Sequence, residues 1–297
     1  METFVLLTIT GLGLAAMYFL IASGLSLIYG LMGVLNFAHG SFLTVGAYGS
    51  WAIAEHLGWI DNSTLRFVAA GLFGIAVGAL FAALVELVLI RPLYRRHIEQ
   101  ILVTVGLALC VGALTQAIWG PEVQVYQAPA WMIDTTTVLG ARIPNDRFVE
   151  IGAAVVVLVA LHVFLRRTRY GLVVRAGVEN RAMVTALGID VRRAFTLVFT
   201  IGGIAAALAG VLTGVYFGGV DPQRGTAVLI FAFIVVVIGG LGSITGSAVA
   251  AVVVGLIQQY ANYYGTSGLG DMAVIALLAV VLLLRPGGLA GKLAPAH

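Results

Sequence analysis

Charged side chains are scarce in this sequence. Only 10% of its 297 residues are Asp, Glu, Lys or Arg, whereas 61% are hydrophobic. Soluble domains carry about 25% charged residues, so a water-soluble fold of this size could not hide so much apolar surface. The net charge of +3 is spread in short clusters between apolar runs, and it does not predict binding to nucleic acid. The sequence therefore points to the lipid bilayer as the solvent.

Cysteine and the familiar catalytic motifs are also lacking. The single thiol, Cys110, lies in an apolar run, which favours a small apolar filler and excludes an internal disulfide or a cysteine metal site. There is no Walker A motif, because Gly291-Lys292 is followed by Leu293, and there is no G-x-S-x-G or H-E-x-x-H pattern. We predict a non-catalytic chain that binds no cofactor, so that any ATPase would be another chain.

Long apolar runs are what the sequence has in abundance. A membrane helix needs about 20 mostly apolar residues, and we find nine candidates, near 4–29, 33–54, 67–90, 99–118, 148–165, 194–217, 226–240, 246–263 and 270–285. The seventh and eighth are short and rich in glycine, which favours broken or re-entrant helices. The predicted fold class is an all-α, polytopic integral membrane helical bundle of about eight to nine spans, in one domain over 1–297.

Arginine and lysine are distributed unevenly between the loops. Twelve of the sixteen fall in one set, namely Arg91, Arg95, Arg96, Arg166, Arg167, Arg169, Arg175, Arg181, Arg192, Arg193, Arg285 and Lys292. Cytoplasmic loops carry an excess of these residues, so this set is predicted to be cytoplasmic, with the N-terminus outside and the C-terminus inside. The long outer loop 119–147 is either an interfacial cap or a docking surface.

Glycines interrupt the apolar runs at two similar hairpins, 30–41 and 239–247. Such breaks are either tight turns at the cytoplasmic surface or irregular backbone that lines a pathway. Small-xxx-small patterns at Gly74–Gly78, Gly210–Gly214 and Gly242–Gly246 predict close helix packing.

Two polar residues, Asn36 and His39, lie at the start of the second apolar run. Polar groups in hydrocarbon are costly unless they are paired, so these residues either line a pathway or form a hydrogen-bond network that fixes the helix break. The full set of pathway or gating candidates is Asn36, His39, Gly40, Gly240, Gly242 and Ser243. Glu86 is predicted to pair with an arginine such as Arg91, and no acid lies centrally in a span, which disfavours an ion-driven carrier.

The cytoplasmic loop 166–193 is the second long loop. Good helix formers fill 178–187, Glu179 suits the helix dipole at its start, and Gly188 can end it in a left-handed cap. The spacing of Val178, Ala182, Met183 and Ala186 predicts a small apolar stripe. This amphipathic helix either rests on anionic lipid or fits a groove on a cytoplasmic partner.

The residues of this loop resemble the coupling helix of ABC importer permeases, and the whole chain resembles the LivH-type permease of branched-chain amino acid importers. The resemblance in the loop rests on Arg175-Ala176, Asn180, Ala182 and Ala186-Leu187-Gly188-Ile189. Elsewhere it rests on Gly33–Gly40, Arg91-Pro92-Leu93, Gly239–Ser243 and Leu284–Leu289. It thus covers essentially the whole sequence.

The resemblance implies one half of a heterodimeric pore in a bacterial inner (cytoplasmic) membrane, with leucine, isoleucine or valine as substrate. Implied partners are a LivM-like second permease, two LivG/LivF-like ABC ATPases that would hold ATP-Mg, a periplasmic or lipid-anchored amino-acid-binding protein, and membrane lipid. The implied ATPase-coupling residues are Arg175, Glu179, Asn180, Ala182, Met183, Ala186 and Gly188. Urea and short-amide importers use closely similar permeases, so they remain an alternative.

Overall fold

The computed structural model describes residues 1–33, 35–94, 96–186, 188, 191–266 and 268–290, without the side chains of 178–182 and 185. The helices are α1 (Glu2–Met32), α2 (His39–His56), α3 (Ser63–Val85), α4 (His97–Trp119), α5 (Ala130–Ile133), α6 (Asp146–Arg167), α7 (Arg169–Ala186), α8 (Val191–Tyr216), α9 (Arg224–Gly239), α10 (Ile244–Tyr264) and α11 (Leu269–Leu284). A π-helical turn, η1 (Glu86–Ile90), and a 3-10 turn, η2 (Arg91–Leu93), extend α3.

Six helical segments in the described part of the chain are long and apolar enough to cross a membrane. They are Glu2–Met32, Ser63–Leu93, His97–Trp119, Asp146–Arg167, Val191–Tyr216 and Ile244–Tyr264. The helices α9 and α11 are apolar but shorter. Each of the nine predicted runs contains a helix. The eighth, α10, is unbroken over 21 residues, so the expectation of a short, broken helix there is wrong.

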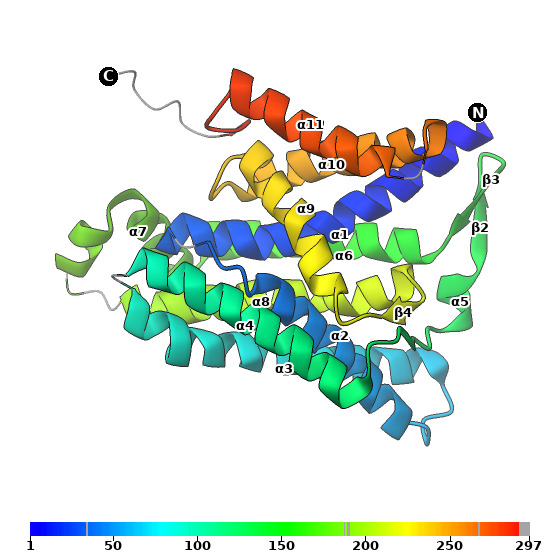
Figure 1. The fold of residues 1–297 in the computed structure, drawn as a ribbon, viewed down its shortest axis with the longest axis horizontal. Coiled ribbons are helices and arrows are strands. Elements are labelled where there is room, and N and C mark those ends of the chain that lie inside the picture. Colours follow the sequence, from blue (N-terminus) through cyan, green and yellow to red (C-terminus); the bar gives the residue numbers. More distant parts are fainter. Residues whose placement is uncertain (34, 95, 187, 189–190, 267, 291–297) are drawn as a thin grey trace.

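The bundle has two distinct ends (Figure 1). The helix α7 lies at one end and the β2–β3 hairpin at the other, and the N-terminus of α1 lies beside the hairpin. A Cβ added to Gly140 in the hairpin turn would lie 2.7 Å from the Glu2 carboxylate. The helix α11 runs toward the α7 end. The start of α1 and the end of α11 therefore lie at opposite ends of the bundle, as the arginine distribution predicts for the two termini.

Two helices begin inside the bundle rather than at its surface. His39, the first residue of α2, places its Nε2 3.2 Å from the carbonyl oxygen of Ile21. Ile21 is eleven residues before the end of α1, which is about 16 Å along a helix. A Cβ added to Gly225, near the start of α9, would lie 2.2 Å from the Gly40 carbonyl oxygen. The first turns of α2 and α9 therefore meet well inside the bundle.

Glycine permits the closest helix crossings, as the small-xxx-small patterns predict. A Cβ added to Gly210 of α8 would lie 2.2 Å from the Leu43 carbonyl oxygen of α2. One added to Gly78 of α3 would lie 2.4 Å from the Ala207 side chain of α8. These contacts hold α2, α3 and α8 together by backbone approach, the mode that favours helix association in lipid.

Short strands modify the predicted all-α fold at the end of the bundle opposite α7. They are β1 (Gln124–Val125), β2 (Thr135–Val138), β3 (Ala141–Pro144) and β4 (Gly219–Val220), paired antiparallel as β1–β4 and β2–β3. The hairpin turn is Leu139-Gly140, with φ of 49° and 89°, the pair of positive angles that a type I′ turn requires. The β-branched run Thr135–Val138 favours extended backbone, which explains the departure from an all-helical chain.

Candidate functional site

The helix α7, in the loop that is predicted to be cytoplasmic, is longer than the predicted 178–187. It begins at Arg169, because the Thr168 hydroxyl accepts a hydrogen bond from the Gly171 N–H at 2.9 Å and caps the helix. A Cβ added to Gly171 would lie 2.2 Å from the Phe164 carbonyl oxygen, so this glycine allows the tight corner with α6. Thr168 is visible in the sequence as a possible helix cap, but the prediction of a start at 178 did not use it.

Opposite faces of α7 have different surroundings. Val174 and Val184 are buried against the bundle. Gly177 lies on the same face, and a Cβ added to it would lie 3.0 Å from the Leu31 side chain. Arg175, Met183, Ala186 and Gly188 are exposed, and Met183 is 61% exposed. Met183 and Ala186, the two members of the predicted apolar stripe whose side chains are described, therefore lie on the exposed face of α7.

Several coupling candidates are only partly described. The side chains of Glu179, Asn180 and Ala182 lie outside the described residues, although their backbone is helical. Gly188 has φ of 76°, the left-handed conformation that its role as a helix cap predicts. Among the described side chains, Arg175, Met183 and Ala186 thus form a surface that a partner could contact.

The break between α1 and α2 is held by Asn36. Its side-chain oxygen accepts a hydrogen bond from the Ala38 N–H at 3.0 Å, while its own carbonyl accepts from the His39 N–H at 3.2 Å. Gly33, with φ of 67°, ends α1. In the predicted span 33–54, residues 33 and 35–38 are therefore not helical, and these local bonds are the physical reason.

His39 is wedged between two helices. It is fully buried, and its ring packs edge-on against Phe42 with 5.4 Å between the ring centres. A Cβ added to Gly24 would lie 3.0 Å from the His39 Cε1, at the point where α1 crosses α8 at Gly202. Within the described structure, His39 Nδ1 and Asn36 Nδ2 have no hydrogen-bond partner. This geometry favours the network that fixes the break; a role in gating stays a prediction.

The glycine turn after α9 contacts the end of α1 on one side and the tail that follows α11 on the other. Gly242, with φ of 85°, lies 3.1 Å from the position of a Cβ on Gly30, so the two glycine hairpins touch. The tail donates backbone hydrogen bonds to the end of α9, from Leu289 to Ile238 at 2.8 Å and from Ala290 to Gly239 at 3.1 Å.

The residues of this turn have local roles in the backbone. Ser243 caps α10 by accepting from the Gly246 N–H at 3.0 Å, and Gly240 has φ of 98°. These contacts favour a structural turn over a moving gate, as one of the two interpretations of the hairpin predicted. A gating role for Gly240, Gly242 and Ser243 stays a prediction.

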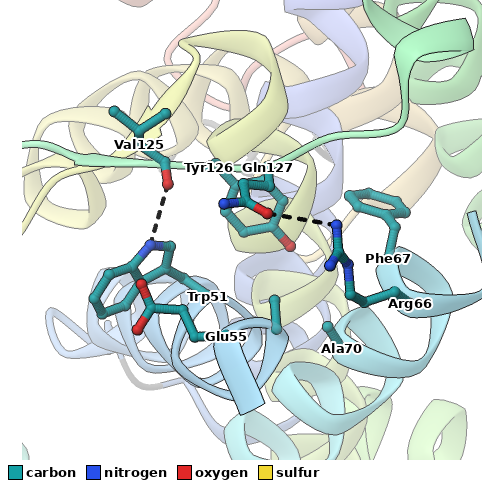
Figure 2. Close-up of a pocket in the computed structure, with 9 residues that line it drawn as sticks. Trp51, Glu55, Arg66, Phe67, Ala70, Val125, Tyr126 and Gln127 are labelled. Carbon is teal, nitrogen blue, oxygen red and sulfur yellow. Dashed lines mark hydrogen bonds between the residues drawn. The ribbon is translucent and has the colours of Figure 1, made fainter. Parts of the chain in front are cut away.

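The loop 119–147, predicted to lie on the outer side, covers α2 and α3 (Figure 2). The Trp51 indole N–H donates to the Val125 carbonyl at 3.1 Å, and the Arg66 guanidinium donates to the Gln127 side chain at 3.5 Å. Tyr126 points inward and shares a hydrogen bond of 2.5 Å with Ser50. Burial raises the pKa of Tyr126 to about 12, against the opposing effect of the Ser50 bond. The loop thus caps α2 and α3 at this end of the bundle.

The pocket beneath this cap is small. Figure 2 shows Glu55 beside Trp51 and Arg66 on the opposite wall. The free space is about 20 Å³, enough for about one water molecule. In this conformation the pocket does not admit an amino acid, so it serves as part of the cap.

A buried charge cluster at the start of α6 was missed by sequence reasoning. Arg147 lies 3.0 Å from Asp146 and 3.6 Å from Glu150, and these side chains are 11%, 9% and 1% exposed. The Arg147 guanidinium carbon lies 3.4 Å from the centre of the Tyr216 ring. The spacing Arg147–Glu150 was visible in the sequence, but its burial against α8 was not.

Glu86 does not have the partner that was predicted. Its carboxylate accepts hydrogen bonds from the hydroxyls of Tyr94 and Thr196, the latter at 2.6 Å. No ion pair with Arg91 is present in the described part of the chain, which corrects the expectation. The carboxylate is fully buried and joins α8 to the end of α3.

Comparisons with known proteins agree with the helical membrane architecture. Residues 7–284 match the family described as branched-chain amino acid transport system / permease component. The LivH permease of Salmonella typhimurium, named for high-affinity branched-chain amino acid transport, is 31% identical over 95% of this chain and 94% of its own length. The corresponding BraD protein of Pseudomonas aeruginosa is 30% identical over 96% and 94%.

A sugar permease is also similar. The fructose import permease FruF of Bifidobacterium longum is 28% identical over 92% of this chain and 75% of its own length. The amino acid permeases match more completely from end to end, and the family match spans nearly the whole sequence. The chain belongs to the branched-chain amino acid transport system permease family.

Proposed function

We propose that this chain is the transmembrane permease subunit of an ATP-driven ABC importer for leucine, isoleucine and valine in the bacterial inner membrane. The observation that carries the proposal is the family match over residues 7–284, together with relatives at 30–31% identity that are named as branched-chain amino acid permeases. In this proposal the chain crosses the membrane eight to nine times and forms half of the translocation pathway.

The partners in this proposal are a LivM-like permease, two LivG/LivF-like ATPases that bind ATP-Mg, and an amino-acid-binding protein on the outer side. The exposed face of α7, with Arg175, Met183 and Ala186, supports contact with an ATPase, because its opposite face is already buried against α1. The outer cap 119–147 would receive the binding protein. Nucleotide-driven displacement of α7 would then switch the pathway between inward-facing and outward-facing states.

The first test is uptake of labelled leucine, labelled fructose and labelled urea by cells with and without this gene. We expect deletion to abolish leucine uptake, and this uptake to follow cellular ATP when an ionophore collapses the ion gradients separately. Loss of fructose or urea uptake alone would contradict the assignment of branched-chain amino acids as the substrate. Uptake that stops with the ionophore while ATP is held constant would contradict the ABC mechanism.

The second test addresses the exposed face of α7. Ala186→Trp places a large side chain on the exposed face of α7. We expect leucine uptake to fall about fivefold to thirtyfold, which corresponds to the roughly 1–2 kcal/mol of a disrupted interface contact, while the protein level in the membrane is unchanged. The matched control is Ala279→Trp on the exposed face of α11. Equal uptake in the two variants would contradict the assignment of α7 as the coupling helix.

A further inference from the structure

A groove at the α7 end of the bundle combines arginine side chains with apolar ones. It is lined by residues of η1, η2, α7 and α8, namely Leu87, Arg91, Tyr170, Arg193, Thr196 and Leu197. Its volume is about 460 Å³, which lies within the range of about 300–1,000 Å³ that is typical of small-molecule sites. The groove is therefore large enough to bind a ligand, unlike the outer pocket.

The groove opens at the edge of a lipid-facing surface. Arg91 lies in the last turn of the apolar segment Ser63–Leu93. Just before it, Leu84, Leu87 and Val88 are 48%, 40% and 64% exposed, as expected for side chains that contact acyl chains. An arginine one turn beyond such residues reaches the layer of lipid head groups.

Local structure fixes the inner wall of the groove. The Arg91 N–H bonds to the Glu86 carbonyl in the π-helical turn η1, and Pro92 follows in the 3-10 turn η2. In the same turn the Glu86 carboxylate accepts from the Thr196 hydroxyl, so this lining residue of α8 is held in place from behind. Distorted helical turns of this kind are frequent at functional sites.

We propose that this groove binds the phosphate-containing head group of an anionic phospholipid of the cytoplasmic leaflet. Guanidinium groups of Arg91 and Arg193 are suited to a phosphate, to which arginine donates two parallel hydrogen bonds. Leu87 and Leu197 are suited to the first methylenes of the acyl chains. Arg91 and Arg193 each place a positively charged side chain on the wall of the groove, which matches the anionic cytoplasmic surface.

Lipid at this position would join three elements. Arg91 belongs to the end of the α3 segment, Arg193 to the first turn of α8, and Tyr170 to the first turn of α7. The bound head group would restrain the start of α7 against the membrane-spanning helices. The binding itself does not rest on the proposed transport function, so it can be tested on the purified chain.

The test measures lipid retained by the full-length chain. The chain is purified in detergent, stripped of native lipid, mixed with micelles that contain phosphatidylglycerol or phosphatidylcholine, and analysed by native mass spectrometry. We expect one saturable phosphatidylglycerol and no comparable phosphatidylcholine. Each basic residue near an anionic surface contributes about fivefold, so R91A/R193A should weaken phosphatidylglycerol binding at least tenfold. Inorganic phosphate should neither bind comparably nor displace the lipid.

The matched control is R96A. Arg96 is cytoplasmic by the same arginine distribution, 67% exposed, and paired with Glu99 at 3.1 Å, but it does not line the groove. If R91A/R193A does not elute as one folded species, R91Q and R193Q replace it, each with an expected loss of about fivefold. Equal retention of the two lipids, unchanged binding in the groove variants, or an equal loss in R96A would each overturn the proposal. Phosphate binding as tight as lipid binding would overturn the lipid as ligand.

Discussion

The replacement Arg147→Met tests the buried charge cluster at the start of α6. Methionine keeps the length and apolar stem of the side chain but removes the guanidinium, which lies 3.0 Å from Asp146 and 3.6 Å from Glu150. Two carboxylates would then remain buried without their cation. Removing one partner of a buried ion pair typically costs about 3–5 kcal/mol, because the remaining charge is neither solvated nor paired.

Other terms of the cluster do not change this range much. The guanidinium stacks on Tyr216 with 3.4 Å between its carbon and the ring centre, and such a contact is worth about 0.5–2 kcal/mol. These contributions overlap, because the same group makes them. We therefore expect Arg147→Met to lower the free energy of unfolding by about 3–5 kcal/mol in total. Adding Glu150→Gln removes the most buried carboxylate charge and should restore about 2 kcal/mol.

The measurement is unfolding of the purified chain by sodium dodecyl sulfate in mixed micelles, followed by tryptophan fluorescence. Arg142→Met is the control, since Arg142 is exposed on β3 and its replacement should change stability by less than about 0.5 kcal/mol. The reasoning is refuted if the two methionine variants unfold alike. It is also refuted if Glu150→Gln lowers the stability of the Arg147→Met variant further.

Two more predictions concern the crossing of α8 with α2 and the loop 119–147. Gly210→Val should lower the free energy of unfolding by about 1–3 kcal/mol, because the new side chain overpacks against the Leu43 carbonyl. Gly112→Ala, whose Cβ meets nothing within 4 Å, should leave the isolated chain equally or more stable. Thermal unfolding of both variants measures this, and equal losses of stability would contradict the close crossing of α8 and α2 at Gly210. Because the pKa of Tyr126 is raised from 10.0 to about 12, the stability that its neutral phenol contributes is complete below pH 10 and is lost as the pH rises toward 12. Tyr126→Phe should therefore reduce the fall in unfolding free energy between pH 10 and 12. An unchanged dependence on pH would contradict the burial of the phenol.

Local sequence was sufficient to find the helices of the nine apolar runs, but not the short helix α5 or the start of α7. The length and apolarity that a membrane span requires are properties of one contiguous segment, so each of the nine runs contains a helix whose ends differ from the prediction by a few residues. The largest error, at the start of α2, lies where Asn36 competes for backbone hydrogen bonds. Asparagine in this role favours turns over helices, and the hydrophobic pattern alone does not show it.

The depth of a helix end depends on contacts that sequence does not reveal. The position of His39 is set by Ile21, eighteen residues earlier, and by the crossing of Gly24 with Gly202. In the same way, Arg147 is buried because Tyr216 of a different helix covers it. The charges were legible in the sequence, but their neighbours are decided by tertiary packing.

The C-terminal end of α1 is the point where the features of the candidate site meet. Leu31 touches Gly177 of α7, and the preceding Gly30 touches Gly242 of the α9–α10 turn. Residues 33 and 35–38, which are not helical, follow α1 and lead to His39 at the level of Ile21. A displacement of α7 toward the membrane would press on Leu31, and it could reach mid-depth through this short segment without bending α1. Residues 35–38 lie outside any helix and are held by local bonds to Asn36, whereas α1 is held by consecutive helical bonds. We therefore expect this segment to be the softer element, and any motion of α7 to appear first at the start of α2.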